Sequence, residues 1–483
     1  MFAVAVLSMS CAKPIIKHAI PRPASPKPEL ASPEANDCNC NAVQNAPIQV
    51  TPIQVTPIQI TPSNKISELA PVDNSNVADY SLLKPAKWEE LDGLLEDDLK
   101  AAWSAWLQSC STLIKQAVIK QALLKPIQFN LTSDKKTAAN SMLAVKPVNN
   151  KPQWQAACAA AINLKTPNNA AIIAYLTDQF NVYSATNQDG SDTGLITGYY
   201  EPILNGSRKQ SSQYPYPLYR EPNDLITVEL ANIHPELKFR RLRGRLANDQ
   251  LNNQKVFDQE ANNQRASGQK LIPYLTRAEI ETNPSPLAGN ELLWIDDIID
   301  IFFLQIQGSG LVNLEVGGQV HVGYANQNGH AYNSIGKLLI QRGELNSDQA
   351  SMQGIKNWAR NHKAQLHDLL NANPSYVFFR ELPAGLSGPL GAQGVPITAQ
   401  RSMAIDPKYV PLGALMFLST TQPNSATSLK RLMVAQDTGG AIKGGVRADY
   451  FWGAGEDAGA KAGAMKQQGK IWVFLPKNFM INH

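Results

Sequence analysis

The sequence predicts a mainly β protein preceded by a helical lead-in. Apolar residues recur at helical spacing between Trp88 and about Gln121. After Thr193 the sequence pattern changes to short apolar runs separated by Gly, Pro and Asn, and such runs continue to the end of the chain. A chain of 483 residues has room for two or three domains, because single cores stop growing beyond roughly 250–300 residues.

Each predicted element has a local signal. Two further helical patterns follow the first, at Trp154–Leu164 and Ala170–Phe180. The next apolar runs, which we expect to be β-structure, are Tyr214–Tyr219, Leu292–Gln307 and Leu311–Val322. Two amphipathic helices are expected within Ile335–Leu370. Strands are then predicted at Tyr376–Phe379, Met403–Ile405, Leu415–Leu418, Leu432–Gln436 and Ile471–Leu475, which suggests a small barrel.

A Pro-rich segment, residues 12–85, precedes this ordered body. Its repeat of Pro, Ile, Gln, Val or Ile, and Thr places a proline at every fifth residue, which blocks helices and central strands alike. The segment also has few large apolar side chains to offset its ordering entropy. We therefore predict a flexible tether, with an end-to-end distance on the order of 50 Å.

The first eleven residues resemble a lipoprotein signal in part. A short apolar stretch, Phe2–Met9, leads to Cys11, but no Lys or Arg precedes it and Leu7 stands four residues before the cysteine instead of three. We interpret residues 1–11 as a signal with a lipidated Cys11. The alternatives are a start codon placed too far downstream or no signal at all. No apolar run approaches the ~20 residues that span a bilayer.

The bulk composition argues against two classes of function. The 44 Lys and Arg residues oppose 40 Asp and Glu residues, and this net charge of +4 is too small and too evenly spread for a nucleic-acid surface. The five cysteines match no zinc spacing, and the seven histidines contain no His-Glu-x-x-His motif. We therefore expect no metal and no other cofactor.

Two cysteines, Cys110 and Cys158, lie in Ala- and Leu-rich segments that are predicted to be helical. A buried, reduced thiol is the ordinary state of such a residue, and we expect it for both. A disulfide between them is the alternative in an oxidising compartment.

Two acids lie in the segment with the strongest chemical signal, Leu432–Gly453. An apolar strand delivers Asp437 into a Gly-rich turn, and Asp449 is followed by Tyr450, Phe451 and Trp452. An apolar wall and a neighbouring carboxylate both raise the pKa of a carboxyl group. Asp449 is the better candidate for a proton donor, because aromatic faces also hold sugar rings. The alternative is a turn cap at Asp437 and an ordinary surface acid at Asp449.

The tripeptide Asp-Thr-Gly is the aspartic-protease signature, and it occurs at Asp192–Gly194 and Asp437–Gly439. Two such loops would supply a carboxylate dyad. Only the second copy follows an apolar strand, because the first follows the polar string Asn187–Ser191, which is typical of a surface turn. The sequence therefore argues against an aspartic protease with a carboxylate dyad.

Other polar clusters indicate a cleft for a neutral ligand. Thr197, two tyrosines and an acid lie near the end of a predicted strand, and Phe302–Gly310 places the amides of Gln305 and Gln307 on one face of another. Satisfied core amides and turn-forming glycines are the alternative. His330 belongs to a pattern that favours a helix start over a general base.

In these segments the chain resembles the membrane-bound lytic murein transglycosylase A family. The likeness runs from about Thr197 to Pro476 and rests on several blocks in a fixed order, which is more specific than any single motif. The blocks are Thr197–Pro202, Tyr214–Arg220, Leu275–Ile280, Phe302–Gly310, Gly329–Ile340, Asn373–Arg380, Pro396–Pro411, Met433–Trp452, Gly459–Gly463 and Trp472.

The resemblance implies a fold and a set of site residues. Its closing part, about 396–476, is similar to the three-aspartate domain, whose acids match Asp406, Asp437 and Asp449. The implied fold is a double-psi β-barrel formed by residues 86–202 and 330–478, with a second small β-domain, 203–329, inserted and a groove between them. The implied acid/base is Asp449. Thr197 and Gln307 would contact the substrate, and Asp437 and Asp406 would support the acid/base.

The implied activity is lytic transglycosylation: cleavage of the β-1,4 bond between N-acetylmuramic acid and N-acetylglucosamine with formation of 1,6-anhydromuramic acid. The partners would be peptidoglycan glycan strands and, through a lipid anchor, the periplasmic side of the Gram-negative outer membrane. The sequence does not identify any other wall enzyme as a partner. A hydrolase on the same barrel and a non-catalytic wall-binding module are the alternatives.

Overall fold

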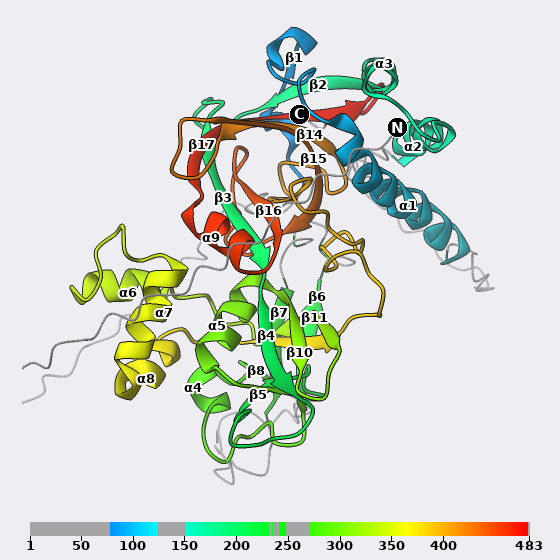
Figure 1. Cartoon of the computed structure of the whole chain (residues 1–483). Coiled ribbons are helices and arrows are strands. Elements are labelled where there is room, and N and C mark those ends of the chain that lie inside the picture. Colours follow the sequence, from blue (N-terminus) through cyan, green and yellow to red (C-terminus); the bar gives the residue numbers. More distant parts are fainter. Residues whose placement is uncertain are drawn as a thin grey trace, which may run out of the picture. The chain divides into compact units, whose positions relative to one another are not determined.

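The computed structural model describes residues 78–123, 151–230, 234, 237, 241–247 and 270–481 (Figure 1). The predicted signal with Cys11 and the tether up to residue 77 lie outside the described residues. The end of the predicted tether is different from our expectation, because Leu83–Ala86 forms strand β1 and pairs with β2 (Phe180–Ala185). β1 is the edge strand of its sheet, where a proline such as Pro85 is tolerated.

Six strands close into a barrel, so the prediction of a mainly β protein is confirmed. The largest sheet has the order β1-β2-β17-β14-β15-β13-β16-β3, and an additional pairing of β17 with β3 closes its last six strands into a ring. The strands of the ring are β3 (Gly194–Glu201), β13 (Ser402–Ile405), β14 (Leu415–Thr421), β15 (Ser428–Thr438), β16 (Ala448–Ala454) and β17 (Lys466–Pro476).

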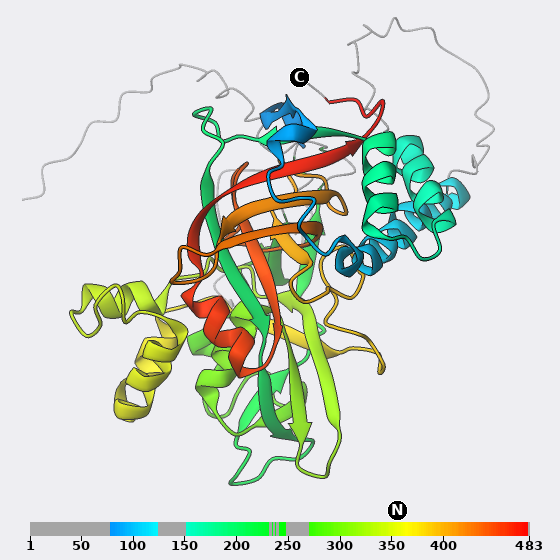
Figure 2. The ribbon, with the colours of Figure 1, turned by 45° about the horizontal axis from the view of Figure 1, so that its top comes forward.

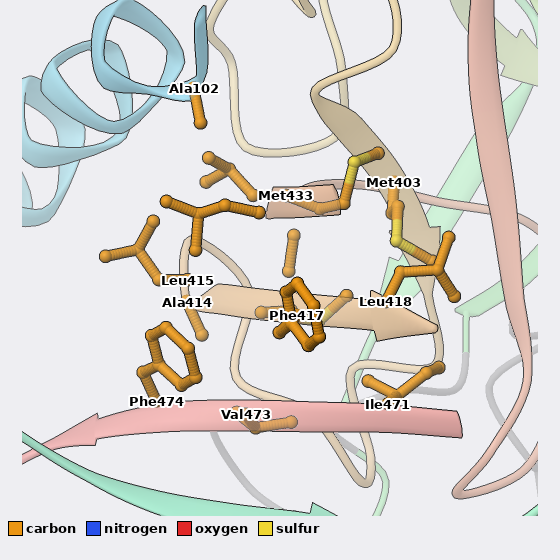
Figure 3. Packing of buried hydrophobic residues seen from close by; sticks show 14 of the residues in the cluster. Ala102, Met403, Ala414, Leu415, Phe417, Leu418, Met433, Ile471, Val473 and Phe474 are labelled. Carbon is orange, nitrogen blue, oxygen red and sulfur yellow. The ribbon is translucent and has the colours of Figure 1, made fainter. Parts of the chain in front are cut away.

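Apolar side chains from four of these strands pack in one hydrophobic cluster that covers both faces of the sheet. Figure 3 shows Met403, Leu415, Phe417, Met433 and Val473 packed together, and all of them are buried. Each fully buried side chain of this size contributes roughly 1.5–3 kcal/mol to folding.

The helical lead-in packs against the barrel, as Figure 2 shows. Its helices are α1 (Leu99–Leu123), α2 (Lys151–Asn163) and α3 (Asn169–Gln179). The three helical patterns are thereby confirmed, although the first helix begins at Leu99 and not near Trp88. Buried residues of all three helices belong to the same hydrophobic cluster as the barrel interior. Cys110 of α1 and Cys158 of α2 form a disulfide, so the expectation of reduced thiols is wrong.

A second β-region lies below the barrel in the view of Figure 1. Its six-stranded sheet has the order β12-β11-β10-β4-β9-β5, and a three-stranded sheet has the order β6-β7-β8. The strands are β4 (Ile203–Ser207), β5 (Tyr216–Tyr219), β6 (Ile226–Glu229), β7 (Arg241–Leu246), β8 (Leu271–Ile272), β9 (Glu291–Ile295), β10 (Ser309–Leu314), β11 (Gln319–Gln327) and β12 (Val377–Glu381). β12 pairs with β11, so the expectation that Tyr376–Phe379 is a barrel strand is wrong.

The run Leu292–Gln307 is not continuous β-structure. It contains strand β9 and then helix α5 (Ile298–Gln307). Asp297 caps the start of this helix by accepting a hydrogen bond from the N–H of Ile299, and Gly308 ends it in the left-handed conformation with φ 83°. Gln305 and Gln307 therefore do not share one face of a strand. Periodicity alone does not distinguish a strand from a helix in a short run of mostly apolar residues, and here the two caps mark the helix.

Three helices pack against α5 and share a hydrophobic cluster with it. They are α6 (Ile335–Gln341), α7 (Met352–Asn361) and α8 (Leu366–Asn371). The two amphipathic helices predicted within Ile335–Leu370 are thereby confirmed, and α8 is additional. Short helices also occur at α4 (Arg277–Ile280) and α9 (Glu456–Ala464). Within the described part of the chain, no helix is long and apolar enough to cross a membrane.

Candidate active site

Four neighbouring barrel strands place Asp437, Ala404, Asp449 and Thr197 in one cross-strand row. Ala404 of β13 pairs with Asp437 of β15 on one side and with Asp449 of β16 on the other. Asp449 in turn pairs with Thr197 of β3. Paired residues of adjacent strands point to the same face of a sheet, and strands lie about 4.8 Å apart. Both acids therefore lie on one face, separated by the small side chain of Ala404.

This face is the one turned away from the barrel core. In β16, Ala448, Tyr450 and Trp452 belong to the barrel cluster, whereas Phe451 packs in a separate small cluster. That cluster also contains Tyr199 and Ala404. Strict alternation of side chains therefore assigns one face of each strand to folding and the other to the site.

A β-bulge brings Asp437 onto the site face. Met403 pairs with Ala435 and Ala404 pairs with Asp437, so Gln436 is the extra residue of β15. The side chain of Gln436 is buried. Without this extra residue, strand alternation would turn Asp437 away from Asp449.

Asp449 has the properties of a group that both gives and takes a proton. It is half-buried, and burial raises the pKa of its carboxyl to about 6. The hydroxyl of Thr197 donates a hydrogen bond of 2.7 Å to Asp449 Oδ1 and lowers this pKa, as does the positive charge of Arg447. The charge of Asp437 raises it. Burial dominates, so the carboxyl titrates near neutral pH.

Asp437 is held more tightly than Asp449. Its Oδ1 accepts hydrogen bonds from the N–H groups of Ala392, at 2.8 Å, and Thr438, at 2.9 Å. Burial raises the pKa of Asp437, and these bonds lower it. The Tyr199 hydroxyl lies near Asp437 and also lowers its pKa, but this hydroxyl is buried without a regular hydrogen bond.

Asp406 shapes the loop between the two other acids. This buried residue follows β13 directly. Its Oδ2 accepts a hydrogen bond from the N–H of Gly444, at 3.1 Å, and its Oδ1 accepts one from the N–H of Lys408, at 3.2 Å. Gly444 has φ 124°, a conformation that favours glycine. The carboxylate therefore ties the turn after β13 to the turn that leads into β16.

Gln307 connects the second β-region to β3. Its Oε1 accepts a hydrogen bond of 3.0 Å from the N–H of Tyr200, whereas Gln305 bonds the buried Arg277. His330 bonds the carbonyl of Tyr274, and the cap of helix α6 is Ser334. The structure therefore brings Gln307 close to the strand of Thr197 and places Gln305 elsewhere.

Sequence reasoning missed two neighbours of the acids. Tyr199 was noted only as a phenol of its strand, and Arg447, whose guanidinium donates to the carbonyls of Leu195 and Ala448, was not singled out. Alternation within β3 was the signal for Tyr199, because it lies two residues after Thr197. Arg447 lies two residues before Asp449, and alternation again puts both on one face.

Among the described residues, no group of three or more His, Cys, Asp or Glu side chains could hold a metal ion. The site contains one carboxyl whose pKa burial raises to about 6, bonded by a hydroxyl and flanked by a second carboxylate. These features are typical of the class of proton-transfer sites.

Comparisons with known proteins define the family. A model described as the MltA specific insert domain matches residues 195–380, and one described as the 3D domain matches residues 401–475. The membrane-bound lytic murein transglycosylase A of Escherichia coli K12 is 32% identical over 306 residues, which cover 61% of this chain and 70% of that protein. The protein of the same name from Vibrio cholerae is 29% identical over 303 residues, covering 61% and 69%.

A solved structure agrees with this assignment. The crystal structure of MltA from Neisseria gonorrhoeae in its monoclinic form superposes with a TM-score of 0.61 at 30% sequence identity, covering 82% of this chain and 93% of that one. The chain belongs to the membrane-bound lytic murein transglycosylase A family. The family predicted from the sequence is confirmed.

Proposed function

We propose that Asp449 is the acid/base with which this chain, a peptidoglycan lytic transglycosylase, cleaves its glycan substrate. The bond cleaved is the β-1,4 bond between N-acetylmuramic acid and N-acetylglucosamine. The observation that carries the assignment is the position of Asp449: it is half-buried, it accepts a hydrogen bond from Thr197, and it shares a sheet face with Asp437. Burial there raises the pKa of Asp449 to about 6, which suits a group that gives and then takes a proton. Asp437 is the weaker candidate, because two backbone N–H groups engage one of its oxygens.

The reaction needs a single carboxyl group. Protonated Asp449 donates its proton to the glycosidic oxygen as the bond from that oxygen to C1 of the muramoyl residue breaks. The resulting carboxylate accepts the proton of the muramoyl C6 hydroxyl while that oxygen bonds to C1. The product is a 1,6-anhydromuramoyl end, no water is consumed, and Asp449 is protonated again. An internal hydroxyl held close to C1 has a large effective molarity, which replaces a positioned water.

Four other residues support this step. The hydrogen bond of Thr197 orients Asp449, and the negative charge of Asp437 raises the pKa of Asp449 and stabilises positive charge on the sugar. Asp406 holds the turn before β16 in place. Thr197 of strand β3 and Gln307, which bonds the N–H of Tyr200 in the same strand, contact the sugar hydroxyls.

The finer architecture is also part of the proposal. We propose that the closed six-stranded ring is a double-psi barrel; its parallel pairings of β13 with β15 and of β16 with β3 support this topology. The β-region that follows Pro202 then acts as an inserted domain, and the glycan strand lies in a groove between it and the barrel. The half-buried position of both acids on the outer face of the barrel wall fits this arrangement.

We propose that the enzyme acts on the periplasmic side of the Gram-negative outer membrane, anchored through a lipid on Cys11. The description of its relatives as membrane-bound supports an anchor. The disulfide between Cys110 and Cys158 supports an oxidising compartment, since cytosolic disulfides are rare. Acyl labelling of the wild-type chain and of Cys11→Ser tests the anchor.

The experiment that tests the acid/base is the Asp449→Asn substitution, because the amide keeps the shape and loses the transferable proton. We expect turnover of purified peptidoglycan to fall at least about 1,000-fold, with folding and glycan binding nearly unchanged. Circular dichroism and a sedimentation assay with peptidoglycan provide the controls. If a folded Asp449→Asn retains more than a few per cent of activity, the assignment is wrong.

A further inference from the structure

A buried network of polar side chains connects the lead-in helix α1 to the barrel. Its four members, Ser109, Gln393, Ser402 and Gln436, are all buried. Ser109 donates a hydrogen bond of 2.6 Å to Gln393 Oε1, and Gln436 Nε2 donates to Ser109 Oγ, at 3.2 Å, and to the carbonyl of Ala105. The hydroxyl of Ser402 completes the network by donating to Gln436 Oε1, at 2.5 Å. None of these side chains has a part in the reaction described above.

The network reaches Asp437 in two ways, through the backbone of Gln436 and through the N–H of Ala392. Gln436 is the bulge residue that directly precedes Asp437, and its carbonyl accepts a hydrogen bond of 3.0 Å from the N–H of Gln393. Ala392, the residue before Gln393, donates its N–H to Asp437 Oδ1. The position of Gln393 thus determines whether the N–H of Ala392 reaches the carboxylate.

Close packing leaves the loop around Gln393 little freedom. A Cβ atom at Gly391 would lie 2.5 Å from the carbonyl oxygen of Gln436, and one at Gly413 would lie 2.5 Å from Gln393 Nε2. Fully satisfied buried polar networks fix a single arrangement, because any other arrangement leaves a polar group unpaired. The position of Ser109 therefore determines the position of the loop around Gln393.

Helix α1 is itself fixed close to this contact. The disulfide of Cys110 lies at the residue after Ser109 and joins α1 to α2. At the start of the helix, the buried Asp97 forms an ion pair of 2.6 Å with Arg401 and accepts a hydrogen bond of 2.7 Å from the N–H of Leu432 in β15. Strand β15 thus contacts Asp97, just before α1, at Leu432 and contacts α1 itself at Gln436.

We propose that α1 is a positioning element of the active site: Ser109, through Gln393 and Gln436, fixes the orientation of the Asp437 carboxylate beside Asp449. This inference rests on the proposed function, and it deepens it. It assigns a role in the reaction to a helix outside the two segments that match the family models, residues 195–380 and 401–475.

The test compares Ser109→Ala with Ser111→Ala, a matched control on the same helix whose exposed hydroxyl bonds only the carbonyl of Gln108. Ser109→Ala frees the loop, which weakens the bond from the N–H of Ala392 and raises the pKa of Asp437. Asp437 then carries less charge, so the pKa of Asp449 falls. We expect kcat to fall about tenfold with KM changed less than about twofold, and the alkaline limb of the pH profile to move to lower pH. Ser111→Ala should match the wild type.

A second variant guards against misfolding. Gln393→Met keeps the volume and removes the hydrogen bonds, and we expect the same changes in kcat and in the pH profile. Kinetics are measured at a temperature at which circular dichroism shows each variant folded. The inference is overturned if the folded variants behave like Ser111→Ala, or if KM rises with no change in the pH profile. An inactive Asp449→Asn together with an unaffected Ser109→Ala rejects this inference alone, whereas an active Asp449→Asn rejects the proposed function.

Discussion

The tripeptide Asp-Thr-Gly occurs twice in this chain, and its two copies have opposite chemistry. Asp192 lies at the surface, where its carboxylate pairs with Lys470 at 2.8 Å, and this contact lowers its pKa. Asp437 lies beside Asp449 and Tyr199, and burial raises its pKa. Identical local sequence therefore leads to one solvated ion pair and one buried acid that lies beside a second carboxyl group.

The two Asp-Thr-Gly copies differ in the structure that precedes them and in the loop that bonds only the second one. Asn187–Ser191 forms a turn closed by a hydrogen bond between Asn187 N and the carbonyl of Ser191, which leaves Asp192 in water. Asp437 lies near the end of the buried strand β15, next to its bulge, and the N–H of Ala392 in a neighbouring loop bonds its carboxylate. Chemical function at a carboxyl group is set by burial and neighbours, and the tripeptide alone does not predict it.

The largest effect that distinguishes the two copies is expected for Asp437→Asn against Asp192→Asn. Loss of the charge of Asp437 removes electrostatic support from the sugar cation, so we expect kcat on peptidoglycan to fall about 100-fold or more. Asp192→Asn should leave kcat within about twofold, since it loses only an exposed ion pair. Equal losses in the two variants would show that the comparison is mistaken.

A third carboxyl group, that of Glu201, is buried but has no part in the proposed reaction, so it shows the effect of burial alone. Glu201 lies on the same face of β3 as Thr197 and Tyr199, and its side chain is buried, with His321 Nδ1 3.4 Å from Glu201 Oε1. Burial raises the pKa of Glu201 from 4.5 to about 7. The folded state thus binds a proton that the unfolded state has lost, and stability falls as pH rises from about 4.5 to about 7.

Glu201→Gln removes this pH dependence. We expect the variant to be more stable than the wild type by about 3 kcal/mol at about pH 8, and equally stable at about pH 4, in urea unfolding followed by circular dichroism. A wild type that is as stable as the variant at the higher pH would mean that Glu201 ionises freely, and that burial in this strand does not raise the pKa.

The smallest effect is expected from the hydroxyl groups that bond the acids. Thr197→Val removes the hydrogen bond to Asp449, whose pKa then rises because that bond favours the anion. The alkaline limb of the kcat profile, which in the wild type falls above about pH 6, should move to higher pH by up to about one unit. Thr193→Val, which removes the bond to Asp192, is the matched control and should leave the profile unchanged. A shift to lower pH in Thr197→Val would contradict the assigned role of the hydroxyl.

Sequence patterns predicted the parts of the molecule that depend on local periodicity. The lead-in helices, the amphipathic helices after Ile335 and most barrel strands followed from spacing, and Asp437 and Asp449 followed from acids set against apolar residues. Helix α5 was missed because its apolar residues run almost without interruption from Ile298 to Leu304, which is also typical of a buried strand. The disulfide and the contact of Ser109 with Gln393 join residues far apart in the chain, so no local pattern contains them.

The central claim is that one carboxyl group, Asp449, transfers a proton from the substrate's own hydroxyl, without water. Digestion of purified peptidoglycan in isotope-labelled water, followed by mass spectrometry of the soluble fragments, tests this claim most directly. We predict fragments that end in 1,6-anhydromuramic acid, lighter by one water than reducing ends and free of the label. Reducing ends that carry the oxygen label would contradict the account and identify a hydrolase on the same barrel.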